Sequence, residues 1–202
     1  MLPAFTRALI VANVAVFLLE LLLRGTMLQW FALWPGTGAG LGALPWRAPW
    51  QLVTYSFLHG SVMHLAFNMF GAWMFGAELE RVWGPRRLAG LYFASVLSAA
   101  GAQLFIGAMF AGSRVPMLGA SGGVFGLLLA YAVVFPYRRL MLLFPPIPMS
   151  ARTFAVAYGV LELVLGVTGT QSGVAHFAHL GGMAGGYLTI QYYRRGPPFR
   201  RR

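Results

Sequence analysis

The stretch GASGGVFG, residues 119–126, places one serine among four glycines at the start of a strongly apolar segment. Such a serine is either a nucleophile on a tight turn or a small residue at which two helices touch. The sequence contains no aspartate. A nucleophilic Ser121 would therefore need a base that no aspartate orients. The composition around it shows which kind of fold holds this stretch.

The amino-acid composition is that of a membrane protein. The 202 residues are 58% hydrophobic and only 9% charged, whereas soluble domains carry about 25% charged residues. Several apolar stretches approach the length of about 20 residues that a membrane-spanning helix needs. We therefore predict an all-α polytopic membrane protein, with one membrane domain over residues 1–196 and a basic cytoplasmic tail over 197–202.

Six membrane spans can be drawn along the chain, at about 8–24, 61–79, 88–111, 117–136, 153–169 and 174–193. The first apolar run lacks a small-residue cleavage site, so we expect a retained span and not a signal peptide. Between the first two spans, the long segment 25–60 contains Trp30, Trp34, Trp46 and Trp50. Tryptophan at this density favours the membrane–water interface. We expect a long interfacial first loop there.

The distribution of arginine predicts the orientation. The formal net charge is +11, and every basic residue is an arginine near the end of an apolar segment. This spacing does not form the basic face that nucleic-acid binding requires, so we expect the lipid bilayer as partner and no nucleic acid. With six spans, twelve arginines lie on the side of both termini: Arg7, Arg81, Arg86, Arg87, Arg138, Arg139, Arg152, Arg194, Arg195, Arg200, Arg201 and Arg202.

The opposite side holds only Arg24, Arg47 and Arg114. Cytoplasmic loops carry the excess of Arg and Lys in membrane proteins. We therefore expect both termini in the cytoplasm and a multi-pass protein of the inner, or plasma, membrane.

The side-chain inventory excludes several kinds of chemistry. Absence of cysteine excludes disulfides and thiolate catalysis, and absence of aspartate excludes a paired-aspartate protease. The metalloprotease motif H-E-x-x-H is also absent. We expect no metal and no cofactor.

The four acidic residues are Glu20, Glu78, Glu80 and Glu162. Glu78 and Glu80 adjoin arginines at the end of the second span, so we expect solvated ion pairs there. Glu20 and Glu162 lie inside spans, where an ionisable residue is by default a candidate for function. We nevertheless favour a structural role for each, as a neutral or a hydrogen-bonded glutamate.

Four other polar side chains share one depth in the predicted bundle. At about 1.5 Å of rise per residue, Ser121 and His179 lie roughly 25 and 22 Å from the arginines that end their spans. His64 and Asn68 lie roughly 25 and 20 Å from the arginine that ends theirs. Three spans therefore place these groups in one layer of a core about 30 Å thick. Scattered structural residues would have no reason to share a depth.

Helical spacing indicates how these groups meet. His64 and Asn68 stand four residues apart on one helix face, as do Ser121 and Phe125. Small residues four apart let two membrane helices approach closely. That spacing recurs in two segments, at Gly119/Gly123 and Gly122/Gly126 and at Gly182/Gly186. We expect helix packing through these glycines to bring the Ser121 hydroxyl within hydrogen-bond reach of His179.

These residues resemble the rhomboid family of intramembrane serine proteases. The segment GASG (119–122) resembles the family's G-x-S-G motif, and AHLGGMAGG (178–186) resembles its A-H-x-x-G-x-x-x-G motif. The segment HGSVMHLAFN (59–68) is similar to its paired-histidine and asparagine motif, and WQLVTYSFLHG (50–60) to the lead-in. There are two small departures from the family pattern. Relatives often carry another small or apolar residue at the position of Gly123, and some have an arginine at the position of Gln51.

The resemblance implies a rhomboid-like bundle of six transmembrane helices and a Ser–His dyad. Ser121 matches the nucleophile and His179 its general base, so the missing aspartate is expected and packing alone orients the ring. Phe125 matches an aromatic that packs on the catalytic imidazole. His64, Asn68 and the backbone N–H of Ser121 match the groups that stabilise the oxyanion.

By the same resemblance, the substrates are transmembrane segments of other proteins, cut near their outer ends through an acyl-enzyme, and the active site opens to the outer side. We expect structural roles for His59, which would hold the loop before the second span, and for His176. The sequence carries no signal for the oligomeric state.

Two other functions compete with this reading. The first is an inactive rhomboid-like protein that binds membrane clients, although such relatives usually lose the serine or the histidine. The second is a small transporter in which Glu20 and Glu162 relay protons. Both Ser121 and His179 are present in this sequence, which weighs against the inactive binding protein.

Overall fold

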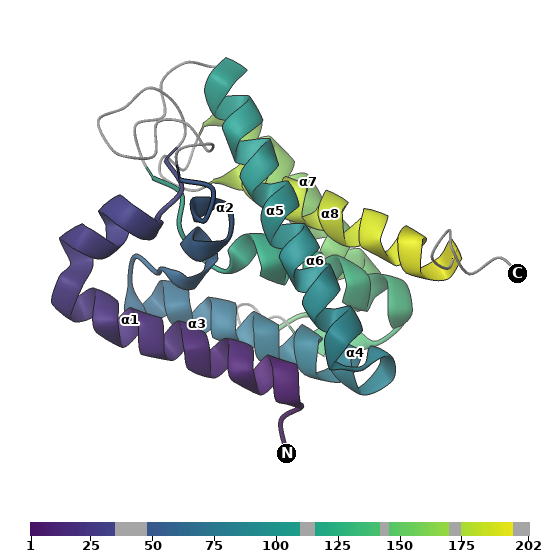
Figure 1. The fold of residues 1–202 in the computed structure, drawn as a ribbon. Coiled ribbons are helices and arrows are strands. Elements are labelled where there is room, and N and C mark those ends of the chain that lie inside the picture. Colours follow the sequence, from purple (N-terminus) through teal and green to yellow (C-terminus); the bar gives the residue numbers. More distant parts are fainter. Residues whose placement is uncertain (35–47, 110–115, 142–145, 170–174, 196–202) are drawn as a thin grey trace, which may run out of the picture.

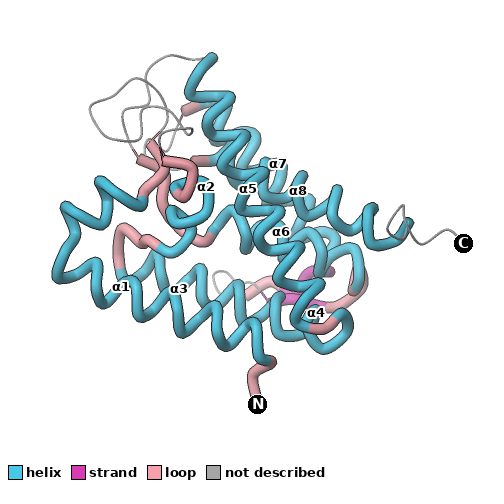
Figure 2. The backbone as a smooth tube through the Cα atoms, viewed as in Figure 1, coloured by secondary structure: helices cyan, strands magenta, loops and turns pink. Residues whose placement is uncertain are grey.

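The computed structural model describes residues 1–34, 48–109, 116–141, 146–169 and 175–195, and these are mostly helical (Figures 1 and 2). Residues 35–47 of the predicted first loop lie outside the described residues, and so does the predicted tail 197–202. The long helices are α1 (Ala4–Phe31), α5 (Pro85–Met109), α7 (Ala151–Thr168) and α8 (His176–Arg195), with the shorter α6 (Ser121–Val134) among them.

The second predicted span forms one continuous helical rod of three parts. It begins as α3 (Val62–Gly71), passes through the π-helical turn η2 (Ala72–Gly76) and ends as α4 (Ala77–Trp83). Short elements complete the described chain: α2 (Gln51–Thr54), η1 (Tyr55–Phe57) and the antiparallel strand pair β1 (Arg139–Met141) and β2 (Pro148–Ser150).

Three of the described helices, α1, α5 and α7, are long and apolar enough to cross a membrane. Apolar side chains on α1 and α7 face outward, including Leu22 at 80% and Val167 at 72% exposure. Exposed leucine and valine over a helix surface suit lipid as the surrounding solvent. The chain is therefore a helical membrane protein with at least these candidate spans in its described part.

The first helix is longer than the sequence predicted. We expected the span to end near residue 24 and an interfacial loop to follow, but α1 continues to Phe31 through a kink at Leu23. Side chains after the loop bind the end of the helix: the indole N–H of Trp50 donates to the Trp30 carbonyl at 2.8 Å, and Thr54 Oγ1 donates to the Phe31 carbonyl at 2.9 Å. These bonds satisfy carbonyls that the end of a helix leaves without a partner.

Helix α6 lies at the centre of the bundle. In Figure 1 it lies behind α5, and it contacts α3, α5, α7 and α8. Its contact with α8 is made by glycines, because a Cβ placed on Gly182 would overlap the carbonyl oxygen of Gly122. A Cβ on Gly186 would lie 2.9 Å from the Cα of Gly126. The two backbones therefore touch, as expected for small residues spaced four apart.

The predicted ion-pair role of Glu80 is wrong. Glu80 is buried and accepts hydrogen bonds from the backbone N–H groups of Phe5 and Thr6, both at 2.8 Å, and from Thr6 Oγ1 at 2.7 Å. These N–H groups belong to the first turn of α1, which has no side-chain cap of its own. Glu78 does form an ion pair, but its partner is Arg138 at 2.9 Å.

Replacement of Gly182 by alanine tests the backbone contact. The added methyl group would force α8 away from the Gly122 carbonyl, so the apparent free energy of unfolding should fall by about 1–3 kcal/mol or more. Thermal denaturation in detergent, followed by circular dichroism, measures the change.

The matched control is Gly101→Ala on α5, where nothing lies within 4 Å of an added Cβ. This variant should be neutral or stabilised by about 0.5–1 kcal/mol, since alanine is the better helix former. Equal stabilities of the two variants would contradict a direct backbone contact between α6 and α8.

Candidate active site

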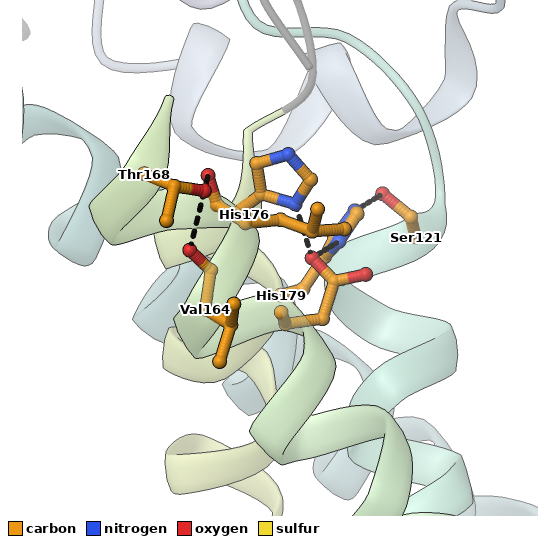
Figure 3. Close-up of polar contacts among 7 residues, drawn as sticks. Ser121, Val164, Thr168, His176 and His179 are labelled. Carbon is orange, nitrogen blue, oxygen red and sulfur yellow. Dashed lines mark hydrogen bonds and ion pairs between the residues drawn. The ribbon is translucent and has the colours of Figure 1, made fainter. Parts of the chain in front are cut away.

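Ser121 and His179 lie side by side at the N-terminal ends of their helices. Ser121 is the first residue of α6, and His179 lies in the first turn of α8. Oγ of Ser121 and Nε2 of His179 are 2.8 Å apart, a hydrogen-bond distance (Figure 3). The glycine contact between the two helices comes shortly afterwards in the sequence. Gly122 is one residue after Ser121, and Gly182 is three residues after His179.

Two further side chains hold the imidazole of His179. The ring of Phe125, one helical turn after Ser121, stacks on it with a centroid distance of 4.3 Å and an interplanar angle of 6°. At the ring nitrogen that does not face Ser121, Oε2 of Glu162 from α7 lies 2.8 Å from Nδ1 of His179. The expectation that packing alone orients the ring is therefore incomplete, because a carboxylate also contacts it.

Glu162 is shared between two histidines of α8. Its Oε2 also lies 2.7 Å from Nδ1 of His176, and both Glu162 and His176 are buried, at 6% and 5% exposure. The sequence offered one signal for this cluster: an ionisable residue inside a span, which in membrane proteins lies against a polar partner. It did not identify the partner.

Glutamate and two histidines are also the kind of side chains that bind zinc, and these three lie within reach of one ion. The separations of 2.7 and 2.8 Å are those of hydrogen bonds. Ligands of one tetrahedral zinc ion at about 2.0–2.1 Å would stand roughly 3.3 Å apart. The three side chains thus form a hydrogen-bonded cluster in this structure.

His64 lies against the turn that precedes Ser121. A Cβ on Gly119 would lie 2.7 Å from both Cε1 and Nε2 of the His64 ring, and Gly119 has φ of +118°. Glycine is therefore required here for both space and backbone conformation. The prediction of Gly119 as a helix-packing residue is wrong, because α6 begins only at Ser121. Gly122, Gly126, Gly182 and Gly186 do lie at the helix contact.

The hydrogen bond at Nδ1 of His64 indicates which tautomer this ring adopts. The backbone N–H of Gly60 donates to Nδ1 through a long bond of 3.4 Å. A neutral imidazole that accepts at Nδ1 carries its proton on Nε2, which here faces the turn before Ser121. This nitrogen can donate to a negative charge that forms near the Ser121 hydroxyl.

Asn68 lies one turn further along α3 and is buried at 5% exposure. Its Nδ2 donates to the carbonyl of His64 in the same helix, at 2.9 Å. The structure thus brings His64 next to the turn at Ser121, while the hydrogen bond of Asn68 lies within its own helix.

A glutamate of α1 binds the segment that precedes α3. The backbone N–H of His59 donates to Oε2 of Glu20 at 2.8 Å, and both side chains are fully buried. The ring of His59 packs edge-on against His64, with centroids 5.0 Å apart. Burial, with a smaller effect of His64, lowers the pKa of His59 to about 4, so the ring is neutral at pH 7. This agrees with a structural role for His59 and Glu20.

The comparisons with known proteins agree with this geometry. A family model described as the Rhomboid domain matches residues 47–196. The chain is 32% identical over 140 residues to Rhomboid protease GluP of Bacillus subtilis, covering 69% of this chain and 25% of that protein. It is 30% identical over 191 residues to the human mitochondrial Presenilin-associated rhomboid-like protein, covering 91% of this chain and 47% of the relative.

A third relative is Rhomboid protease GlpG of Yersinia pestis, 29% identical over 189 residues, with 91% of this chain and 60% of that protein covered. The chain thus spans between a quarter and three fifths of the length of these relatives. The family model covers most of this sequence, including His64, Ser121, Glu162 and His179. The chain belongs to the rhomboid family.

Proposed function

We propose that this protein is an intramembrane serine endopeptidase that cleaves transmembrane segments of other membrane proteins. The observation that carries the proposal is the 2.8 Å contact between Oγ of Ser121 and Nε2 of His179. Serine becomes a strong nucleophile only when a neighbouring base takes its proton. The names of two relatives, Rhomboid protease GluP and Rhomboid protease GlpG, agree with this class of activity.

The reaction proceeds in two halves through an acyl-enzyme. Oγ of Ser121 bonds to the carbonyl carbon of the substrate peptide while its proton passes to Nε2 of His179. The bond from that carbon to the amide nitrogen then breaks, and Nε2 gives the proton to the leaving amine. In the second half, water bonds to the acyl carbon and gives a proton to Nε2. The ester bond to Oγ breaks, and the proton returns to Ser121.

The negative oxygen of each tetrahedral intermediate needs donors that are already in position. Nε2 of His64 and the backbone N–H of Ser121 at the start of α6 are two such donors, and Asn68 is a third candidate. Ser121 N–H belongs to the first turn of α6, where backbone N–H groups have no partner inside the helix and favour negative charge.

The proposed topology has six spans, with α3, η2 and α4 together as the second. Both termini face the cytoplasm of a cell whose inner, or plasma, membrane holds the protein. The support is the arginine count of twelve against three on the two sides. The dyad then lies toward the outer side, where water for the second half of the reaction can enter.

The transporter alternative has less support. Glu20 accepts the N–H of His59, and Glu162 contacts two imidazoles, so both carboxylates have local partners. The client-binding alternative does not require the serine and histidine to be hydrogen-bonded to each other, as they are here.

Cleavage of a single-span reporter protein by the purified enzyme tests the dyad. Ser121→Ala and His179→Ala should each abolish product, since one lacks the nucleophile and the other the base. The matched control is Ser98→Ala on α5, which should retain activity, because the Ser98 side chain lies against Gly185, six residues and therefore about 9 Å along α8 from His179. Product from folded Ser121→Ala protein would contradict the serine-protease mechanism.

His64→Ala tests oxyanion stabilisation. The loss of one preorganised donor should lower kcat by a factor on the order of 10²–10³ with a much smaller change in KM. Met63→Ala, an exposed neighbour on the same turn, is the control and should stay near the wild type. A kcat for His64→Ala within a few-fold of the control would remove His64 from the oxyanion site.

A further inference from the structure

The dyad described above is extended by a third side chain from a third helix. The Nδ1 atoms of His176 and His179 converge on the same atom, Oε2 of Glu162, at 2.7 and 2.8 Å. Figure 3 shows both rings directed at one oxygen, and His179 also at Ser121. We infer that Glu162 is a positioning residue for the general base, so that this protein works with a Ser121–His179–Glu162 triad.

The geometry determines which nitrogen of His179 carries the proton. An oxygen approached by two ring nitrogens accepts from both when it belongs to an ionised carboxylate, since a protonated oxygen could donate to only one of them. His179 therefore carries its hydrogen on Nδ1. Its Nε2 is then left with a lone pair that faces the Ser121 hydroxyl. This is the tautomer that a general base requires.

The same contact acts later in the reaction. When Nε2 takes the proton of Ser121, the imidazole becomes positively charged in a partly buried site. A carboxylate 2.8 Å from Nδ1 stabilises that cation. The inference rests on the proposed function, because it assigns a role to Glu162 only within proton transfer from Ser121.

His176 contacts the same carboxylate oxygen as His179 and so helps to hold the Glu162 side chain in place. His176 and His179 are three residues apart and so lie on one face of α8, opposite α7. A glutamate side chain has several rotatable bonds, and a second donor reduces its freedom. His176 thus acts through Glu162, which in turn acts through His179.

A purely structural role for Glu162 is the competing explanation. The buried residues of α7 are Ala151, Ala155 and Glu162, so this carboxylate is also a polar contact between the second half of α7 and α8. A tie of this kind would be weakened by loss of either histidine contact. It would affect the stability of the bundle and not the reactivity of Ser121.

The experiment compares wild type, Glu162→Gln, Glu162→Asp and His176→Ala, with Glu78→Gln as control. Glu78 is a carboxylate on α4 paired with Arg138, fourteen residues along the helical rod from His64 and therefore about 21 Å away. Four quantities are measured for each: the rate of Ser121 labelling by a fluorophosphonate, kcat and KM for reporter cleavage, and the thermal midpoint.

The expected result for Glu162→Gln is a fall in both labelling rate and kcat by about 10–10³-fold with KM within a few-fold of wild type, below the loss of about 10⁴ in kcat known for a full triad carboxylate. Glu162→Asp keeps the negative charge of the wild type on a side chain that is one methylene shorter. It should recover part of the rate that Glu162→Gln loses. His176→Ala should lower the rate less than Glu162→Gln, and Glu78→Gln should not change it.

A labelling rate of folded Glu162→Gln within threefold of wild type would overturn the inference, as would equal effects of Glu162→Gln and His176→Ala on stability with none on labelling. A wild type that neither labels nor cleaves would overturn the proposed function, and the triad with it.

A measurement on the wild type avoids dependence on how the variants fold. Nitrogen-15 spectra of labelled histidine distinguish a ring with hydrogen on Nδ1 from one with hydrogen on Nε2, and His179→Ala assigns the signal. The triad requires His179 to carry hydrogen on Nδ1 at neutral pH. Hydrogen on Nε2 instead would overturn it.

Discussion

The backbone contact between α6 and α8 is the constraint on which the rest of the structure depends. Where Gly122 meets Gly182 and Gly126 meets Gly186, no side chain separates the two helices. Ser121 and His179 stand at the adjoining ends of these helices, so the helix separation sets the distance between their side chains. A hydrogen bond of 2.8 Å between two rigid helices therefore follows from residues that have no side chain at all.

Three buried carboxylates fix further contacts between elements of the described chain. Glu80 holds the first turn of α1 to α4, Glu20 holds the segment before α3 to α1, and Glu162 joins α7 to α8. A carboxylate away from water is costly unless hydrogen-bond donors compensate it. Each of these three therefore fixes a particular pair of elements. Two of these contacts adjoin the candidate site: Glu20 binds the backbone N–H of His59, whose ring packs on His64, and Glu162 contacts His179.

Much of the site could be predicted from the sequence because its signals are local. Ser121 and His179 share a depth along their spans, their glycines recur at spacings of four, and the three motifs occur in the order of the rhomboid family. The match to the Rhomboid family model confirms the resemblance. The resemblance to that family implied that the ring of Phe125 packs on the imidazole of His179, and the two rings do stack.

The features that could not be predicted from the sequence depend on which helices become neighbours in the fold. Helix α7 is apolar on nearly all sides, so its hydrophobic pattern does not show which face points inward. The partner of Glu162 was therefore not predictable, and packing alone was expected to orient His179. The same reason applies to Glu80, whose partners lie more than seventy residues away in the sequence. The end of α1 was missed because side chains beyond the loop, Trp50 and Thr54, satisfy its last carbonyls.

The most direct test of the central claim is to locate the residue that a fluorophosphonate modifies in the folded wild-type protein. Such a reagent phosphonylates a hydroxyl that a neighbouring base activates. Peptide mass spectrometry after labelling in detergent should find one adduct per chain, on Ser121. No adduct at Ser121, or modification spread over other serines, would contradict the account of Ser121 as a nucleophile activated by His179.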